Sequence, residues 1–310
     1  MSVSVAVETI TAREDPKATL ADDVGPTLDA LAKQTVAPDE VLVVVDVHVD
    51  PKAVDDIRRR YPHVKIVTST SNYFAAKNAG AAAASGDNVA LLDSDCVPAP
   101  DWLELLLARL TPGVDAVAGR TRYTGRGLFA RTLSVPDFAF VLEQESGTST
   151  GMNINNVVFR RDVLLRHPFD ARIRRNGGCY FLFNQLRAAG SRMLYEPRAA
   201  TQHGFASVPT LLRKHFDRGY DGVTVYRLDD AGVLRGSRWF RRFGALALVA
   251  ITARRVVVDW IRLARHRRQI GIAAAALPYY CAVVIVTRSL ELAGGFTAVA
   301  SPRRYTPCET

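Results

Sequence analysis

Residues 74–105 have the sequence FAAKNAGAAAASGDNVALLDSDCVPAPDWLEL, which contains the clearest structural signals of the chain. Alanine, the best helix former, dominates residues 74–84, and the apolar run NVALL follows at 88–92. A continuous apolar run is typical of a parallel strand that is buried on both faces. Asp93 and Asp95 come directly after this run. We therefore predict a helix, a buried strand and two carboxylates at the carboxyl end of that strand.

Similar apolar runs precede this segment. They lie at residues 3–7, 40–45 and 64–68, and helical patterns such as 24–34 separate them. This alternation is typical of β-α-β units, so we predict an α/β fold with an open, mainly parallel sheet and flanking helices. Ligands of such sheets bind beyond the carboxyl ends of the strands. Later elements are expected as a helix from 101, strands near 114–120 and 194–197, a strand and helix within 152–166, and a helix over 178–189.

The two aspartates have the spacing of a divalent-cation site. In an extended segment, side chains two residues apart point to the same side, so Asp93 and Asp95 can bind one ion together. Mg²⁺ and Mn²⁺ are commonly held by one or two carboxylates together with substrate phosphates. An Asp-x-Asp triplet alone is weak evidence, and a turn with aspartate caps is the alternative. The buried strand before the triplet favours a metal site, because burial of charges without a ligand is costly.

Residues 74–105 resemble the core of the family 2 glycosyltransferases, which have the GT-A fold. Members typically show a small-residue helix with Arg/Lys-Asn-x-Gly, then Gly-Asp/Glu, an apolar strand, Asp-x-Asp and Pro-x-Trp-Leu, and nearly all of these occur here. The segment 27–46 is similar to the family's first helix, its Gln-Thr/Ser-x-x-Pro-x-Glu turn and its second strand. Further similarity reaches about residue 215 through segments at 151–153, 159–161 and 169–170, and through Glu196, Pro197 and His203.

The resemblance implies transfer of a sugar from a nucleoside-diphosphate donor to an acceptor, with inversion of configuration and with Mg²⁺ or Mn²⁺ as cofactor. It also implies a set of site residues: Asp46 for the donor base, Lys77 and Asn78 for the base or phosphate, Asp93 for the ribose or metal, Asp95 for the metal, and His203 for the metal or diphosphate. Structural alternatives stay open for three of them. Asp46 can cap a turn, Lys77 can be a solvated helix residue, and a lone His203 is as often a structural residue.

The acceptor side departs from the family pattern. Inverting members generally use an Asp of a Glu-Asp pair as the base, and Gly178 and Cys179 occupy this position. A base is needed because a sugar hydroxyl is a poor nucleophile at neutral pH. Three explanations are open: another carboxylate, such as Glu143, Glu145 or Asp170, is the base; the acceptor is a phosphate or carboxylate; or the protein binds sugar nucleotides without turnover. We expect the first, with Glu145 as the candidate catalytic base.

The charge is distributed unevenly along the chain. Residues 201–310 hold 17 of the 40 Lys and Arg residues but only 7 of the 31 Asp and Glu residues, so the net charge of +9 arises here. This part also holds the longest apolar blocks, 243–260 and 270–286. The blocks predict a helical hairpin that packs within the protein or lies on a membrane, and anionic lipid suits the charge better than nucleic acid does. We expect a glycosyltransferase domain at 1–205, a helical membrane-associated or oligomerisation region at 206–300, and a flexible tail at 301–310.

Composition excludes several other classes. The four cysteines lie far apart without a Cys-x-x-Cys pair, which indicates neither a zinc site nor a disulfide framework. No secretory signal peptide is indicated, so we expect a cytoplasmic protein, peripheral on the inner face of the cell membrane, with a glycan or lipid-linked acceptor and no nucleic-acid partner. A homo-oligomer is a further expectation. The alternatives are a nucleotidyltransferase, disfavoured because residues 8–20 lack a Gly-rich phosphate loop, and a non-catalytic sugar-nucleotide-binding or scaffold protein.

Overall fold

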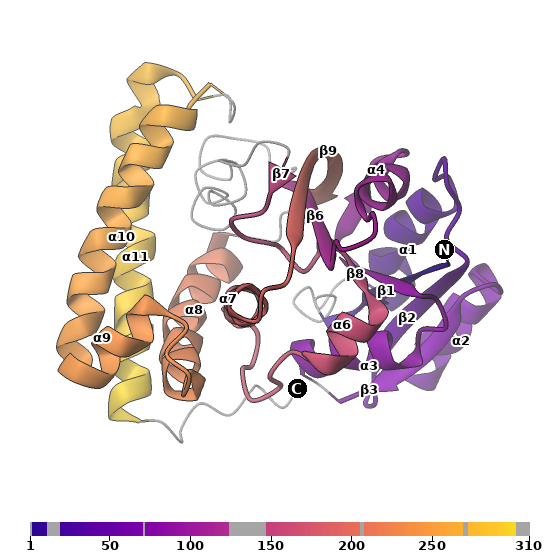
Figure 1. The fold of residues 1–310 in the computed structure, drawn as a ribbon, viewed down its shortest axis with the longest axis horizontal. Coiled ribbons are helices and arrows are strands. Elements are labelled where there is room, and N and C mark those ends of the chain that lie inside the picture. The colour runs from indigo at the N-terminus through magenta and orange to yellow at the C-terminus, as the bar shows by residue number, and fades with distance from the viewer. Residues whose placement is uncertain are drawn as a thin grey trace. The chain divides into compact units, whose positions relative to one another are not determined.

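The computed structural model describes residues 2–10, 19–70, 72–123, 147–204, 208–268 and 272–301 (Figure 1). The chain divides into two compact units. The first unit comprises Met1–Thr124, Gln144–Ala171 and Leu186–Gly204, and the second comprises Gly125–Glu143, Arg172–Gln185 and Phe205–Thr310. The predicted base Glu145 and residues 302–310 of the predicted tail lie outside the described residues.

A mixed sheet forms the centre of the first unit. The described strands have the order β3-β2-β1-β4-β8-β6-β9-β5, and β7 pairs with β9. Their bounds are β1 (Val3–Glu8), β2 (Glu40–Asp46), β3 (Lys65–Ser69), β4 (Asn88–Asp93), β5 (Cys96–Pro98), β6 (Ala116–Tyr123), β7 (Gly147–Thr148), β8 (Asn156–Arg160) and β9 (Met193–His203). Strands β3, β2, β1 and β4 are parallel, whereas β8 is antiparallel to β4 and β6. The carboxyl ends of the four parallel strands therefore meet at one edge, where Glu8, Asp46 and Asp93 end β1, β2 and β4.

Side-chain caps fix where the first helices begin. In α3 (Tyr73–Ala83), the Asn72 side chain accepts hydrogen bonds from two backbone amides of the first turn. Thr19 and Asp50 cap α1 (Leu20–Leu31) and α2 (Pro51–Arg60) in the same way. Three further helices are described before residue 205: α4 (Trp102–Arg109), α6 (Arg161–Arg166) and α7 (Gly178–Ala188). Helix α7 contributes residues to both units. Leu28 of α1 and Trp102 of α4 share one buried core with the sheet residues.

The sheet confirms the predicted fold class, including the four parallel strands at 3–7, 40–45, 64–68 and 88–92. The last strand differs from the expectation, because β9 has 11 residues and continues beyond Pro197. A β-bulge explains the difference: the pairing of β6 with β9 shifts its register between Gly119 and Arg120. Glycine is needed at 119, since a Cβ there would lie 2.2 Å from the Ala199 carbonyl oxygen. The bulge thereby extends β9 as far as His203.

The chain after residue 207 is helical where it is described. The elements are α8 (Val208–Leu228), α9 (Arg235–Phe243), α10 (Ala245–His266), the 3-10 turn η2 (Ala274–Ala276) and α11 (Leu277–Ala300). Helices α10 and α11 lie side by side as a hairpin (Figure 1). Glycines let α8 approach α11 closely: a Cβ on Gly219 would lie 1.7 Å from the Glu291 carbonyl oxygen, and one on Gly294 would lie 1.9 Å from that of Phe216.

Buried ion pairs connect these helices. Arg288 of α11 donates to Asp259 of α10 at 2.6 and 2.8 Å and to Glu291 at the same two distances. His215 of α8 lies 3.1 Å from Glu291. Within the described residues, Ala274–Ala300 is the one stretch long and apolar enough to cross a membrane, and 44% of its most apolar window is buried inside the protein. The ion pairs along α11 favour a packed hairpin over a lone span, because charges in hydrocarbon are costly.

Candidate active site

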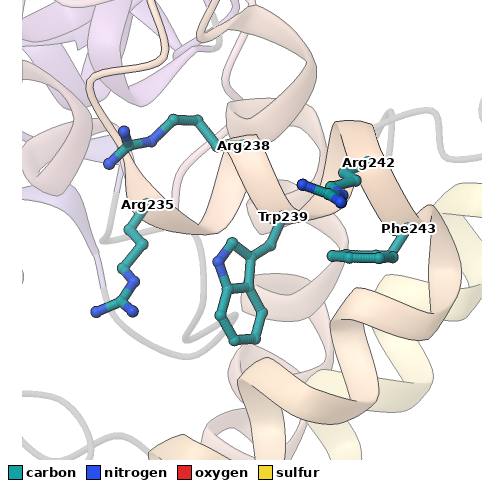
Figure 2. Close-up of a pocket in the computed structure, with 5 residues that line it drawn as sticks. All are labelled: Arg235, Arg238, Trp239, Arg242 and Phe243. Atoms are coloured by element: carbon teal, nitrogen blue, oxygen red, sulfur yellow. The ribbon is translucent and has the colours of Figure 1, made fainter.

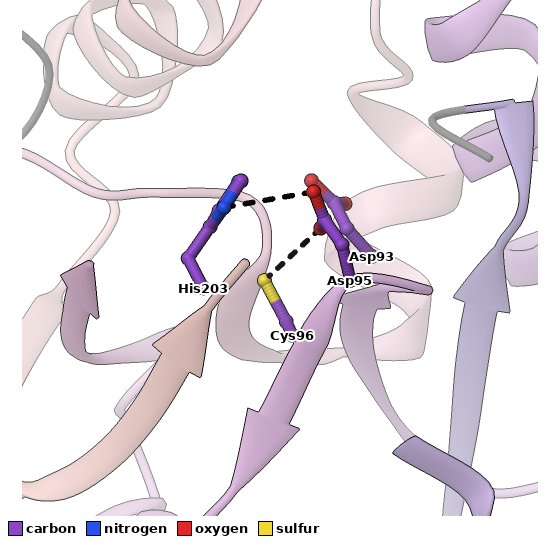
Figure 3. A group of neighbouring side chains, drawn as sticks. All are labelled: Asp93, Asp95, Cys96 and His203. Atoms are coloured by element: carbon purple, nitrogen blue, oxygen red, sulfur yellow. Dashed lines mark hydrogen bonds and ion pairs between the residues drawn. The ribbon is translucent and has the colours of Figure 1, made fainter. Parts of the chain in front are cut away.

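The Asp-x-Asp triplet lies where the sheet brings two distant parts of the chain together. Asp93 ends β4, and Asp95 lies in the turn before β5. Strand β5 pairs with β9 so that Cys96 is opposite His203. Ligand atoms of Asp93, Asp95, Cys96 and His203 all lie within 4.8 Å of one another (Figure 3). The pairing of β5 with β9 therefore completes a group of four side chains that could hold a metal ion.

Asp93 is a buried anion held by two side chains of α3. Lys77 Nζ lies 2.5 Å from Asp93 Oδ1 and 2.5 Å from the Leu92 carbonyl oxygen. The Tyr73 hydroxyl lies 3.0 Å from both carboxylate oxygens of Asp93. Burial would raise the pKa of Asp93, but the charge and hydrogen bond of Lys77, together with His203 and the Tyr73 hydroxyl, outweigh burial, and the pKa lies below its ordinary value. Asp93 is therefore ionised, and Lys77 balances one negative charge of the site.

Asp95 is the more accessible carboxylate, with 20% of its side chain exposed. Its Oδ2 lies 3.5 Å from His203 Nδ1, and its Oδ1 lies 3.6 Å from Cys96 Sγ. His203 Nδ1 also lies 2.7 Å from the Gly204 carbonyl oxygen. Because a carbonyl oxygen only accepts, this contact favours a hydrogen on Nδ1, which puts the lone pair of a neutral ring on Nε2. In this tautomer, His203 could bind a metal ion only through Nε2.

The donor atoms fit a hard divalent cation. Asp93 and Asp95 supply carboxylate oxygens and His203 supplies a nitrogen, a combination that suits Mg²⁺ or Mn²⁺. Cys96 differs, because burial, together with the charges of Asp95 and Asp93, raises the pKa of its thiol well above the ordinary value. The thiolate is the form that binds metals, so Cys96 contributes little as a ligand. Two carboxylates facing one ammonium group leave a net negative charge that a cation would balance.

Side chains of α1 form hydrogen bonds with the turn that carries the triplet. Thr27 is fully buried, and its Oγ1 lies 2.6 Å from the Ser94 carbonyl oxygen and 3.0 Å from that of Cys96. The Ser94 amide donates to the Glu8 carbonyl oxygen at 2.9 Å, which ties the turn to β1. The Ser94 hydroxyl donates to Asp23 at 3.0 Å. These bonds hold the backbone of the triplet in one position.

Thr27 and Tyr73 support the site although no sequence motif singles them out. Thr27 lies next to Leu28 on the apolar face of α1, and a buried hydroxyl in such a place needs a hydrogen-bond partner. Tyr73 precedes Lys77 by four residues, so the two lie on the same face of α3. Both features are visible in the sequence, but only the structure shows that they converge on residues 93–96.

Two other predicted residues have different surroundings. Asp46 is buried at the end of β2, and its Oδ1 accepts a hydrogen bond from the His48 amide at 2.8 Å. Asn78 exchanges hydrogen bonds with the Phe169 backbone, donating at 2.8 Å and accepting at 3.0 Å. In this structure Asn78 therefore fixes the segment after α6. Contact of either residue with a nucleotide stays a prediction.

The candidate bases of the acceptor side are less well defined by the structure than the donor side is. Glu143 and Glu145 lie outside the described residues. Helix α7 begins at Gly178, followed by Cys179, and its first turn contains no acidic residue. The acidic pair that the family resemblance leads one to expect is therefore absent from the start of this helix.

A protein-family comparison bears on this arrangement. Residues 17–166 match the model of the family described as Glycosyl transferase family 2. The chain carries a family 2 glycosyltransferase domain. The matched region contains β2, β3 and β4 with Lys77 and the Asp-x-Asp triplet, and it confirms the resemblance of residues 74–105 to this family.

Known relatives agree with this assignment. The chain is 24% identical over 237 residues to the glycosyltransferase AglE of Haloferax volcanii. The aligned region covers 74% of this chain and 75% of AglE. The mannosyltransferase PcManGT of Pyrobaculum calidifontis, solved in complex with GDP-Man and Mn²⁺, has a TM-score of 0.62 and 18% identity, covering 97% of this chain and 87% of its own. TarS 1–349 of S. aureus, solved with UDP, has a TM-score of 0.50 and 16% identity, covering 98% and 91%. The similarity to these two structures shows that the chain shares their GT-A fold.

Proposed function

We propose that this protein is a metal-dependent hexosyltransferase that moves a sugar from a nucleoside-diphosphate donor to an acceptor with inversion of configuration. The observation that carries the proposal is the group formed by Asp93, Asp95 and His203 at the carboxyl edge of the sheet in a family 2 domain. PcManGT was solved with GDP-Man and Mn²⁺ and TarS with UDP, which supports a nucleotide-sugar donor for this chain as well.

Different residues of the site would bind the metal ion, position a carboxylate and recognise the donor base. Asp95 and His203, together with Asp93, would hold Mg²⁺ or Mn²⁺. When bound, the cation would neutralise the negative charge that develops on the departing diphosphate. Lys77 keeps Asp93 ionised and fixed in place. Asp46 would accept a hydrogen bond from the donor base, since β2 ends two strands away from β4 at the same edge.

For the acceptor side we propose a hydroxyl group of a cell-envelope glycan or a lipid-linked precursor, with Glu145 as the base that removes its proton. The protein would work at the cytoplasmic face of the membrane. The absence of an acidic residue from the first turn of α7 supports the alternative, a sugar-nucleotide-binding or scaffold protein without turnover. The two proposals share the donor site and differ only in the presence of a base.

Calorimetric titration tests the donor site. GDP-, UDP- and TDP-sugars would be titrated into the full chain with Mn²⁺, with Mg²⁺ and with EDTA. We expect at least one donor to bind with a metal ion and not in EDTA. If none of them shows metal-dependent binding, the proposed function is wrong. Asp162→Asn is the matched control, since this exposed residue forms an ion pair with Arg166 of its own helix and is not one of the proposed metal ligands.

Turnover separates the enzyme from the non-catalytic alternative. Release of the nucleoside diphosphate from the donor that binds would be followed with a membrane-lipid extract as acceptor source. We expect release with the wild type and about a thousandfold less with Glu145→Gln, as for loss of a general base. Metal-dependent binding without release by the wild type would support the non-catalytic protein instead.

A further inference from the structure

Helix α9 presents arginine and aromatic side chains on one face. Arg235, Arg238, Trp239, Arg242 and Phe243 have the spacing i, i+3, i+4, i+7 and i+8, which places them on one side of a helix. All five are exposed, Trp239 to 39% and Phe243 to 52%. They line one shallow pocket, in which the Trp239 and Phe243 rings lie beside the guanidinium groups (Figure 2).

Cation-π contacts hold this face in its arrangement. The guanidinium carbon of Arg235 lies 5.8 Å from the centre of the Trp239 ring, and that of Arg242 lies 5.2 Å from the centre of the Phe243 ring. In the part of the chain that the structure describes, no carboxylate lies within ion-pair distance of Arg235, Arg238 or Arg242. The face therefore carries three positive charges without an acidic partner among the described residues.

The opposite face of α9 anchors the helix. The buried Asp229 accepts hydrogen bonds from the Val233 and Leu234 amides, each at 2.9 Å, and from the Ser237 hydroxyl. Arg241 donates to the Asp229 carbonyl oxygen. Since these inner contacts hold α9 in place, the three outer arginines are not needed for that purpose.

Exposed apolar residues also occur along the next helix. Leu246, at the start of α10, is 77% exposed, and Val249, Val257 and Ile261 are each about half exposed. Their spacing of three, eight and four residues keeps them close to one side of α10. An apolar stripe of this length next to a basic, aromatic helix is unusual for a surface that only water contacts.

We propose that the outer face of α9, together with the exposed stripe of α10, is a docking surface for an anionic lipid bilayer. The guanidinium groups would bind lipid phosphates, while Trp239 and Phe243 enter the boundary between headgroups and acyl chains, where aromatic side chains are favoured. Charge complementarity selects this occupant. A second copy of the chain in a two-fold contact would bring six unbalanced arginines together. The inference does not depend on the proposed donor site.

Vesicle flotation tests the docking surface. The full chain would be floated with vesicles of phosphatidylcholine alone and with 30% phosphatidylglycerol at about 0.1 M salt, where the Debye length is about 10 Å. We expect binding to the anionic vesicles only. The triple variant Arg235→Gln, Arg238→Gln, Arg242→Gln should partition about 100-fold more weakly, at roughly a fivefold loss for each arginine near the surface.

A matched control removes three positive charges elsewhere. Lys33, Lys52 and Arg58 are exposed on the first unit, and their triple replacement by Gln should change partitioning by less than about threefold, because they do not belong to the proposed docking surface. Unchanged binding of the α9 triple variant, or equal weakening by the control triple, would overturn the proposal. Failure of the wild type to float with anionic vesicles would overturn it as well.

Quenching of Trp239 gives a second, independent measurement. Trp260 would be replaced by Phe, so that the remaining tryptophans are Trp239 and the fully buried Trp102. Lipids brominated on the acyl chain near the headgroup should then quench the emission in a manner that Trp239→Phe abolishes. Sedimentation in the absence of lipid excludes or reveals a second copy as the occupant. A dimer that the double variant Trp239→Ala, Phe243→Ala dissociates, with no lipid quenching, would overturn the proposal.

Discussion

The two units each bury a cluster of charged residues, but the charges of the two clusters balance differently. At the end of β4, the carboxylates of Asp93 and Asp95 face one ammonium group, that of Lys77. Around α11, a single carboxylate, that of Glu291, forms ion pairs with Arg288 at 2.6 Å and with Arg255 at 3.2 Å. Among the described residues, the first cluster has a lysine partner for Asp93 and a histidine for Asp95, whereas both carboxylates of the second cluster, Asp259 and Glu291, pair with arginines.

This difference separates a binding site from a structural network. Buried charge is stable only when it is balanced, so a cluster with excess negative charge is suited to receive a cation. The cluster around Glu291 has no such excess. Burial would raise the pKa of Glu291, but Arg288, His215, Arg255 and Arg218 outweigh burial and hold the pKa well below its ordinary value. Its carboxylate therefore serves to join α8, α10 and α11.

The largest effect is expected at Asp93, because this residue belongs both to the proposed metal site and to a buried ion pair. Asp93→Asn leaves the Lys77 ammonium group, which is 1% exposed, without its counter-ion. We expect the free energy of unfolding to fall by about 3–5 kcal/mol, the usual result of removing one partner of a buried ion pair. Metal-dependent donor binding should be lost as well. Urea denaturation and calorimetry would measure the two effects.

The double variant Lys77→Met, Asp93→Asn is the control for this prediction. It removes both charges and should recover part of the stability without recovering metal-dependent binding. A single variant as stable as the wild type would show that the Lys77–Asp93 pair contributes nothing to the fold.

At Asp95, metal-dependent binding should be affected without a matching loss of stability. Asp95 is partly exposed, so Asp95→Asn should change the free energy of unfolding by less than about 1 kcal/mol. The affinity for the donor in Mn²⁺ should fall at least about 100-fold, which corresponds to about 2.7 kcal/mol of binding free energy. Titration with and without the metal would show the loss in Mn²⁺ only. Normal affinity would move Asp95 from the ligand set to the structural residues.

Glu291 should affect stability alone, and in a pH-dependent manner. At pH 7, Glu291→Gln should lower the free energy of unfolding by about 2–3 kcal/mol, a value reduced from that of a fully enclosed pair because Arg255 is half exposed. The pKa of Glu291 is lower in the folded than in the unfolded chain. Its carboxylate therefore stabilises the fold fully above the unfolded pKa of about 4.3, and the contribution is lost as the pH falls below it.

Unfolding of the wild type and of Glu291→Gln at pH 7, 5 and 3 would measure this dependence. The difference in stability should be constant between pH 7 and 5 and should shrink at pH 3. Donor affinity at pH 7 should be unchanged. A difference that grows on acidification contradicts the assignment.

The two units also differ in how much of their structure the sequence could predict. The parallel strands were predictable because their apolar runs are continuous, and Asp93 and Asp95 were predictable because they follow such a run directly. The extension of β9 to His203 was not, since Gly119 and Pro197 indicate a bulge only once β6 and β9 are known to pair. The network around Glu291 was likewise hidden, because its members come from three helices and are spaced like ordinary surface charges.

The smallest effect is expected from a residue that acts on the site only through the backbone. Thr27→Val removes the hydroxyl that lies 2.6 Å from the Ser94 carbonyl oxygen and keeps the shape of the side chain. We expect a loss of about 1 kcal/mol in the free energy of unfolding, as for one buried hydrogen bond. Donor affinity in Mn²⁺ should weaken by about fivefold, again about 1 kcal/mol, because the turn between Asp93 and Asp95 loses a support. Thr27→Ser retains the hydroxyl and should restore the affinity. If Thr27→Val lowers stability but leaves the metal-dependent affinity intact, the turn does not need α1 to hold its carboxylates in place.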